Sequence, residues 1–263
     1  MPDGRDLIVG VDAGTSVMKA VAFTLRGRQI ASASIRNSYE SGDHGAATQS
    51  MSRTWADCAG AVRKLLERDA SLASRVVAIA VTGQGDGTWL IDRDGEPVAD
   101  AWLWLDARAA PTVERLSALS GDQQRFAATG TGLNTCQQGS QLAHMAQEYP
   151  ALLDRTATAF HCKDWLYFKL TGVRATDPSE VSFTFGNFRS GDYDHAVIEA
   201  LGLSAHRSLL PPVLEGTRTV HPLSGDAAQA LGLKAGLPVC LGYVDMAMTA
   251  LGAGVRTHRE NAA

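Results

Sequence analysis

The stretch that decides the fold is residues 7–16, which read LIVGVDAGTS. Its first half is almost entirely apolar, which is typical of a strand buried on both faces, and its second half is rich in turn residues. A second strand is predicted over residues 18–25 and a third over residues 29–34, joined by a short polar turn at residues 26–28. We therefore expect the chain to open with an antiparallel meander.

Helical and strand patterns alternate after this meander. Apolar residues recur at helical spacing over residues 51–68 and residues 76–82 form another apolar run, so strand, helix and strand predict a crossover onto a mixed sheet. A fifth strand is expected at residues 239–241, with a helix over residues 246–251 directly behind it. Further helices are expected over residues 109–119, 137–148, 164–170, 193–201 and 227–231. The predicted fold class is α/β, with a mixed five-stranded sheet and flanking helices.

The composition is that of an ordinary globular protein. The 263 residues are 45% hydrophobic and 20% charged, the formal net charge is -4, and Lys and Arg are scattered rather than clustered. The first residues lack the basic and apolar regions of a signal peptide, and no stretch reaches the roughly 18 apolar residues of a membrane span. The 4 cysteines form no CxxC pair, which argues against a zinc ribbon. We expect a cytoplasmic protein that binds a small molecule and has no nucleic-acid or membrane partner.

Three acidic segments share one local plan. At Asp12, Asp86 and Asp245 a buried strand runs out into a glycine-containing segment that presents a carboxylate. In open α/β sheets the ligand crevice lies beyond the carboxyl ends of the strands, so three carboxylates placed in this way could surround one site. Aspartate is also common in turns and helix caps, and that plainer interpretation stays open for each of them alone.

The segment after Asp12 suits nucleotide phosphates. Gly14 allows a close backbone approach, Thr15 and Ser16 offer hydroxyl donors, and Lys19 adds positive charge. Asp12 itself could hold Mg²⁺, usually through water. A hairpin turn capped by Asp12 would have the same short sequence. No GxxxxGK[ST] sequence occurs, so a P-loop is excluded.

Two other segments invite a functional reading and have a structural alternative. Residues 161–164 read HCKD and group potential metal ligands closely, but they lack a partner pair at ligand spacing, so we interpret them as the start of a helix. Asn134, Gln137 and Gln138 are rich in amide donors and acceptors, yet as solvent-exposed helix-capping residues they would need no function.

The order of motifs resembles that of the FGGY carbohydrate kinase family. The resemblance runs through five short stretches, which are VDAGTS at residues 11–16, WLDAR at 104–108, KDWL with LTG at 163–172, LPP at 210–212 and GYVD at 242–245. It covers nearly the whole N-terminal domain of such kinases. It implies a ribonuclease-H-like, actin-like ATPase domain, ATP and Mg²⁺ as cofactors, and transfer of the ATP γ-phosphate to a sugar or polyol hydroxyl.

The resemblance also assigns roles to single residues. It implies that Asp245 is the general base, that Asp12 helps to place the metal, and that Lys19 occupies the position of a basic residue near the phosphates. It further implies that Gly14, Thr15 and Ser16 face those phosphates. An aspartate is a weak base, but a loose phosphoryl-transfer transition state requires little early proton removal.

Substrate choice in the family depends partly on the loop TGQGDG at residues 82–87 and on the aromatic residue that matches Trp104. Glycerol kinases carry an arginine and a glutamate where this chain has Gly85 and Asp86. Losing the arginine opens volume, while Asp86 keeps an acceptor for hydroxyls, which suits a longer polyol. Both this loop and GYVDMAM at residues 242–248 are similar to the erythritol kinases of the family. Gln84, Asp86, Trp104 and Asp245 are therefore the predicted substrate contacts.

The resemblance finally predicts the domain organisation. Residues 1–255 are expected to be the N-terminal domain, which binds the polyol and carries the base, and residues 256–263 a polar tail or the start of an interdomain segment. The family's C-terminal domain, which supplies most of the adenosine site, is expected to be absent. The alternatives are a non-catalytic sugar-binding domain, a kinase for xylulose or a pentitol, and an actin-like ATPase that binds protein. A homodimer is also possible.

Overall fold

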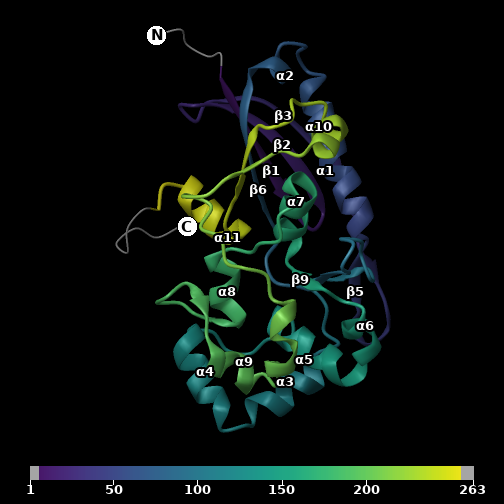
Figure 1. Ribbon diagram of the computed structural model, residues 1–263, viewed down its shortest axis with the longest axis vertical. Coiled ribbons are helices and arrows are strands. Elements are labelled where there is room, and N and C mark those ends of the chain that lie inside the picture. The colour runs from purple at the N-terminus through teal and green to yellow at the C-terminus, as the bar shows by residue number, and fades with distance from the viewer. Residues whose placement is uncertain (1–5, 256–263) are drawn as a thin grey trace.

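The centre of the computed structural model, which describes residues 6–255, is a six-stranded mixed sheet (Figure 1). The order across the sheet is β12-β13-β6-β1-β2-β3. These strands are β1 (Leu7–Ala13), β2 (Val17–Thr24), β3 (Gln29–Arg36), β6 (Val76–Gly83), β12 (His221–Pro222) and β13 (Pro238–Leu241). All five predicted strands are present, and the α/β class is confirmed. The sixth strand, β12, is only two residues long and leaves no periodic pattern from which to predict it.

The strand directions place three strand ends together. Strands β1, β2 and β3 are successive antiparallel neighbours, as the predicted meander requires. Strand β6 returns parallel to β1 after helix α1 (Met51–Leu66), and β13 lies parallel to β6. The neighbouring strands β13, β6 and β1 therefore run in the same direction and end at the same edge of the sheet.

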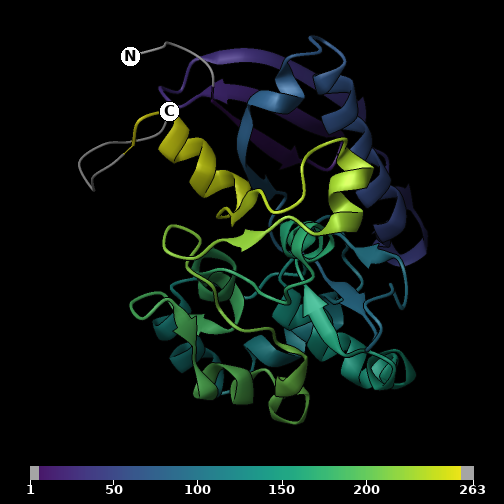
Figure 2. The same cartoon turned by 45° about the horizontal axis from the view of Figure 1, so that its top comes forward.

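The two faces of the sheet differ in burial, which corrects the prediction that β1 is buried on both faces. Leu7, Val9, Val11 and Ala13 of β1 are buried, whereas the residues between them are only partly covered. The buried face packs against α1, α7 (Cys162–Thr171) and α10 (Gly225–Leu231). Helix α11 (Asp245–Gly252) lies on the opposite side of the sheet in both ribbon views (Figure 2). It has no buried residue, so it covers this second face incompletely.

Helix α1 shows why the sequence folds in this way locally. The Ser50 hydroxyl caps the helix by accepting a hydrogen bond of 3.4 Å from the backbone amide three residues on. Of the predicted apolar face, Ala59 and Val62 are buried, and Trp55 and Leu66 are partly buried against the same core. The predicted amphipathic helix is therefore confirmed with its packing face.

A second group of helices lies below the sheet in Figure 1 and has a core of its own. Its helices are α3 (Ala110–Ser117), α4 (Gly121–Thr129), α5 (Gln138–Glu148), α6 (Pro150–Asp154), α8 (Pro178–Thr184) and α9 (His195–Ala200). The core includes Leu142, Met145, Leu153, Phe185, Val197 and Leu201. The predicted helices correspond to α3, α5, α7, α9, α10 and α11, whereas α4, α6, α8 and α2 (Leu72–Arg75) were not predicted. Helices α2 and α6 have only 4 and 5 residues, and the 9 residues of α4 and the 7 of α8 include few apolar ones, so no apolar repeat marks them.

Short strands and turns connect the two groups. They are β4 (Glu40–Ser41), β5 (Ala47–Gln49), β7 (Trp89–Ile91), β8 (Ala101–Trp102), β9 (Thr158–Phe160), β10 (Gly186–Asn187) and β11 (Asp192–Tyr193), with 3-10 turns at Asp43–Gly45 and Ser204–Leu209. Strand β8 pairs with β5, and β7 pairs with β9, so segments distant in sequence meet beside the main sheet.

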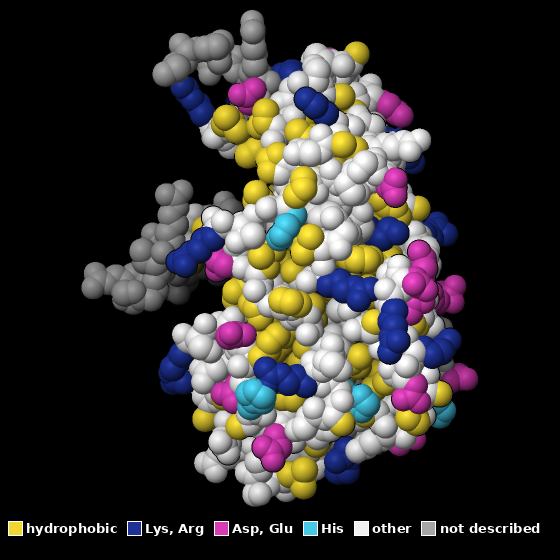
Figure 3. Space-filling view, viewed as in Figure 1, with side chains coloured by type: hydrophobic (Ala, Val, Ile, Leu, Met, Phe, Trp, Pro, Cys, Tyr) yellow, Lys and Arg dark blue, Asp and Glu magenta, His cyan; other side chains and the backbone are white. Residues whose placement is uncertain are grey.

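Within residues 6–255, no helix combines the length and apolarity that crossing a membrane requires. On the face shown in Figure 3, Lys and Arg side chains lie scattered among acidic and apolar ones. The predicted polar tail at residues 256–263 lies outside the described residues.

Candidate active site

Three polar segments follow the ends of the parallel strands β1, β6 and β13. Asp12 is the second-last residue of β1, Gln84 directly follows β6, and Asp245 begins α11 shortly after β13. Because these strands are neighbours, their carboxyl ends deliver all three side chains to one edge of the sheet. Two cavities open at this edge, and Asp245 borders both.

The first cavity has a volume of about 310 Å³, which is enough for a small ligand. All four predicted substrate contacts, Gln84, Asp86, Trp104 and Asp245, line it. The remaining lining residues are Thr15, Gly85, Phe183, Val244 and Met246. The structure therefore brings together the carboxylates, the amide and the indole that the sequence placed far apart.

A hydrogen-bonded relay joins the two sides of the first cavity. The Trp104 indole Nε1 donates to the Thr15 hydroxyl at 2.9 Å, and that hydroxyl donates to Gln84 Oε1 at 2.8 Å. Gln84 Nε2 in turn donates to Gln49 Oε1 at 2.9 Å. Gln84 is only 3% exposed, so its amide is held in one orientation by buried partners. Trp104 is 45% exposed and presents its ring to the cavity.

Asp86 lines the same cavity and has one carboxylate oxygen without a hydrogen-bond partner. Its Oδ2 accepts a hydrogen bond from Cys136 Sγ at 3.3 Å, whereas its Oδ1 is buried without a partner. Burial raises the pKa of the Asp86 carboxyl, and this effect outweighs the hydrogen bond from Cys136 and the charge of His161, which both lower it. Asp86 also has a φ of 54°, a left-handed conformation that is uncommon outside glycine. Such backbone strain is concentrated at functional sites.

The glycines of the 83–87 loop allow close approach to the protein itself rather than directly to a ligand. A Cβ on Gly85 would lie 2.3 Å from Val244 Cγ2, and a Cβ on Gly83 would lie 2.9 Å from the Ala13 Cβ. Gly87 has a φ of 72°, and a Cβ there would lie 2.6 Å from the Trp102 carbonyl oxygen. The volume opened by having no side chain at position 85 is therefore occupied by Val244, which packs the loop against the segment that carries Asp245.

Asp245 is the first residue of α11 and borders both cavities. Its Oδ1 accepts a hydrogen bond of 2.7 Å from the Met246 backbone amide. Burial raises the pKa of the Asp245 carboxyl, the amide of Met246 lowers it, and the nearby charge of Asp12 raises it further. The net shift is upward, so Asp245 is a better proton acceptor than an exposed aspartate.

The second cavity, of about 360 Å³, lies between the incompletely covered sheet face and α11. Asp12 and Lys19 line it together with Asp245. Asp12 and Lys19 are directly opposed in the β1–β2 pair, and burial raises the pKa of Asp12 while the Lys19 charge lowers it. Among residues 6–255, no group of three or more His, Cys, Asp or Glu side chains could enclose a metal ion. The two carboxylates suit Mg²⁺, which usually keeps several waters and binds one or two carboxylates together with phosphate oxygens.

Gly14, Thr15 and Ser16, which were predicted to face the phosphates, have different surroundings in the turn after Asp12. The Thr15 side chain lies in the relay of the first cavity, as described above. Ser16 is exposed, and the carbonyl oxygens of Gly14 and Ser16 accept hydrogen bonds from Asn37 at 3.0 Å and 2.9 Å. Asn37 thus holds the backbone of this turn in place.

Gln137 and Gln138 were expected to be exposed, and this expectation is wrong. They are 2% and 1% exposed, and Gln138 Nε2 donates to the Phe160 carbonyl at 2.6 Å. Gln137 Nε2 donates to the Phe183 carbonyl of α8 at 3.3 Å, so the two amides pair with backbone groups of α8 and β9, which explains the local richness in glutamine.

Sequence reasoning missed three lining residues of the first cavity. Phe183 comes from α8, which was not predicted, and Val244 and Met246 flank Asp245. None carries a chemical motif, since each contributes apolar surface only. For Val244 and Met246, the sequence signal was their position next to Asp245.

Comparison with known proteins agrees with this geometry. Residues 7–252 match the N-terminal domain of the FGGY family of carbohydrate kinases. The chain is 65% identical to an erythritol kinase of Brucella abortus over 255 residues, which are 97% of this chain and 49% of that protein. It is 29% identical to an L-xylulose/3-keto-L-gulonate kinase of Escherichia coli, covering 94% of this chain and 50% of that protein. The chain thus spans about half the length of these curated relatives.

Solved structures show the same fold. The crystal structure of a xylulose kinase from Rhodospirillum rubrum superposes with a TM-score of 0.88 at 25% identity, covering 95% of this chain and 51% of that one. A Plasmodium falciparum glycerol kinase with ADP gives a TM-score of 0.81 at 17% identity, covering 95% of this chain and 50% of that one, and shows the fold alone. The predicted actin-like fold is confirmed. With its sequence match, its fold and the strand-end cavities in agreement, the chain belongs to the FGGY family of carbohydrate kinases.

Proposed function

We propose that the complete protein is an ATP-dependent polyol kinase that transfers the ATP γ-phosphate to a terminal hydroxyl of erythritol. The observation that carries the proposal is the position of Asp245 between two cavities. One is lined by hydroxyl-binding groups and an indole, and the other by Asp12 and Lys19. The 65% identity to the Brucella abortus erythritol kinase supports erythritol as the acceptor.

The first cavity would bind the polyol. A buried, unpaired acceptor costs about 1–3 kcal/mol, and a substrate hydroxyl donating to Asp86 Oδ1 would relieve this cost. Gln84, held by Thr15 and Gln49, would add polar contacts in a fixed orientation. The exposed face of Trp104 would cover the carbon chain of the polyol.

Asp245 would orient the attacking hydroxyl and accept its proton late in the transfer. In phosphoryl transfer most of the catalysis is positioning and electrostatic stabilisation, so a carboxylate with a raised pKa is sufficient. The same carboxylate borders the second cavity, so a hydroxyl bound to it would face the phosphate side.

The second cavity would receive the phosphates. Lys19 would contact phosphate oxygens, and Asp12 would hold Mg²⁺ through water. Bound Mg²⁺ would neutralise charge on the transferred phosphoryl group. The Asp12 charge raises the pKa of Asp245, which fits this role, because a cation between two half-buried carboxylates relieves their repulsion.

The first test is ADP release by a full-length version of the protein. We expect release that depends on both erythritol and Mg²⁺, and a loss in kcat on the order of 10²–10⁴-fold in Asp245→Asn, which keeps the shape of the side chain but cannot accept the proton. Activity that is unchanged by this substitution would exclude Asp245 as the base. Glycerol, xylulose and pentitols serve as competing acceptors, and a clear preference for one of them would replace erythritol in the proposal.

Calorimetry on this chain alone tests a second candidate, a sugar-binding domain without turnover. All the predicted polyol contacts lie within the described residues, which favours binding by this chain alone. Erythritol binding that is lost in Asp245→Ala would locate the site beside Asp245, and its loss in Asp86→Ala, at a residue that lines the first cavity but not the second, would place it in the first cavity. Binding without ADP release by the full-length version would favour the non-catalytic function. A cytoplasmic location and a homodimer stay predictions.

A further inference from the structure

A cluster of buried charges lies behind the first cavity. It consists of His161, Lys163, Asp164, Asp177 and Glu180, all at most 3% exposed, and we call it the buried charge cluster. Lys163 Nζ lies 2.8 Å from Asp164 Oδ1 and also binds Asp177 Oδ2. His161 Nδ1 lies 3.0 Å from Asp164 Oδ2, and its Nε2 lies 3.7 Å from Glu180 Oε2. Charges buried this deeply are held only where each is paired, so the cluster fixes α7 relative to the start of α8.

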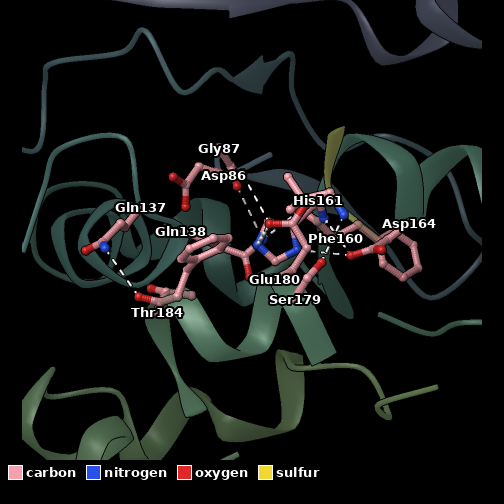
Figure 4. A network of polar contacts seen from close by, with 12 residues as sticks. Asp86, Gly87, Gln137, Gln138, Phe160, His161, Asp164, Ser179, Glu180 and Thr184 are labelled. Atoms are coloured by element: carbon pink, nitrogen blue, oxygen red, sulfur yellow. Dashed lines mark hydrogen bonds and ion pairs between the residues drawn. The ribbon is translucent and has the colours of Figure 1, made fainter. Parts of the chain in front are cut away.

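The first turn of α8 connects this cluster to the Asp86 side of the cavity. Glu180 Oε2 accepts a hydrogen bond of 3.3 Å from the backbone amide of Asp86. Figure 4 shows Ser179 and Glu180 close to Asp86 and to the His161–Asp164 pair. Glu180, a member of the buried charge cluster, thus binds the backbone amide of Asp86 and helps to hold its strained conformation.

The same turn connects to the Asp245 side. Ser179 Oγ accepts a hydrogen bond of 2.9 Å from the backbone amide of Val244 and donates one of 2.5 Å to Asp177 Oδ1. Asp177 also caps α8 and pairs with Lys163. The residue immediately before Asp245 is therefore tied through Ser179 to the buried charge cluster.

The two connected segments also touch each other. The Val244 side chain fills the space next to Gly85, where even a Cβ would lie 2.3 Å from Val244 Cγ2. The Thr82 hydroxyl also donates a hydrogen bond of 2.6 Å to the carbonyl oxygen of Tyr243, the residue directly before Val244. The loop with Asp86 and the segment with Asp245 are thus packed together and both held by α8.

We propose that Ser179 and Glu180 are positioning residues that fix the Asp86 and Asp245 carboxylates relative to each other through the backbone. This inference rests on the proposed function, because it names how the polyol acceptor and the base are held in register. Neither side chain lines either cavity, so neither is expected to touch the substrate. A displacement of about 1 Å at such a site can cost up to 10²-fold in rate.

The experiment compares substitutions within α8. Ser179→Ala removes the acceptor for the Val244 amide, and Ser179→Thr restores a hydroxyl. Ser182→Ala is the matched control, because Ser182 Oγ donates only to the Pro178 carbonyl of the same helix, at 2.6 Å. Glu180→Gln is the conservative variant: it keeps an acceptor for the Asp86 amide, so kcat and affinity should stay close to those of the unsubstituted protein if Glu180 acts through that hydrogen bond.

We expect Ser179→Ala to weaken erythritol binding by this chain about threefold and to lower kcat of the full-length version about tenfold. Ser182→Ala should stay within about twofold of the unsubstituted protein, and Ser179→Thr should recover most of the loss. A role in helix stability alone would lower the melting temperature in both serine variants without changing kcat. Equal kcat and affinity in Ser179→Ala and Ser182→Ala would overturn the inference.

Hydrogen exchange separates failure of this inference from failure of the proposed function. The Val244 amide should be protected in the unsubstituted chain and lose protection in Ser179→Ala but not in Ser182→Ala. Val244 exchange that is equal in all three proteins would refute the positioning link even if erythritol binds. If no polyol binds and no ADP is released, the proposed function fails, and the positioning role fails with it.

Discussion

At the scale of single residues, Thr15 has a position that its motif alone does not predict. Its hydroxyl accepts from the Trp104 indole and donates to Gln84, so one side chain connects the turn after β1 to both walls of the first cavity. The turn that is expected to face the phosphates and the pocket that is expected to bind the polyol are therefore joined by two hydrogen bonds.

Replacing Thr15 with valine tests this connection. Thr15→Val keeps the shape but removes the hydroxyl, leaving the Trp104 Nε1 and the buried Gln84 Oε1 without their partners. A hydrogen bond contributes about 0.5–1.5 kcal/mol net, so we expect the affinity for erythritol to fall about three- to tenfold. We also expect tryptophan fluorescence to change, because the Trp104 indole loses its hydrogen-bond acceptor. Calorimetry and an emission spectrum measure both.

Thr24→Val is the matched control for this substitution. The Thr24 hydroxyl accepts from the Arg28 amide at 3.2 Å in the β2–β3 turn, away from both cavities. Affinity for erythritol should be unchanged in Thr24→Val. An equal loss of affinity in the two variants would show that the Thr15 relay has no special role.

At the scale of elements, the contact between the 83–87 loop and the segment before α11 depends on one missing side chain. In Gly85→Ala the new Cβ would collide with Val244, a branched side chain with little freedom to move aside. We expect a loss of about 1–3 kcal/mol in the free energy of unfolding and a marked loss of erythritol binding. Urea unfolding and calorimetry provide the two measurements.

Gly132→Ala is the control for that substitution, because nothing lies within 4 Å of a Cβ at position 132. It should leave both stability and binding close to those of the unsubstituted chain. If Gly85→Ala is equally silent, Val244 is free to yield, and the loop is not fixed by this contact.

The elements also show what the sequence could predict. The five longer strands and the convergence of the strand-end segments that carry Asp12, Asp86 and Asp245 were predictable, because apolar runs mark strands and the ends of neighbouring parallel strands meet. Helix α8 was not predicted because its 7 residues carry no apolar period, although an aspartate cap, a proline in its first turn and an acidic residue in that turn mark its start. The positions of Ser179 and Glu180 depend on the tertiary packing of α7 on α8, which no local pattern encodes. The sequence places HCKD at the start of α7 but does not reveal its partners in α8.

At the scale of the whole molecule, the buried charge cluster makes stability depend on pH. Burial raises the pKa of Glu180 to about 8, so its contribution is complete below the ordinary carboxyl value of 4.5 and is lost as the pH rises through 8. Burial lowers the pKa of His161, but the charge of Glu180 helps to raise it, and the net shift is upward. The stability that His161 contributes is therefore lost as the pH rises above its ordinary pKa of 6.5. Burial raises the pKa of Asp164, but the Lys163 charge helps to lower it to about 2. The stability that Asp164 contributes is therefore lost only as the pH falls below 3.8.

We therefore expect the free energy of unfolding to decrease as the pH rises from about 5 to 8, by at most about 1.4 kcal/mol per pH unit for each proton released. Glu180→Gln, which does not titrate, should flatten this slope and also reduce the part due to His161, because the Glu180 charge raises the pKa of His161. Glu199→Gln, at an exposed position of α9, should not change it. Urea unfolding at constant ionic strength over this range gives the slopes. A curve that rises towards pH 8 would contradict the assignment.

The shared border of the two cavities has one more consequence. Because Asp245 lines both, a molecule that occupies both cavities would lie against that carboxylate. Under the proposed function, the phosphorylated product is such a molecule, with its carbon chain on the Trp104 side and its phosphate on the Lys19 side. Once Asp245 has released the proton that it accepted from the hydroxyl, two negative groups, phosphate and carboxylate, would lie next to each other. The product would then be repelled at the point where the reactants were held, so its release would be favoured by the same residue that aligned them.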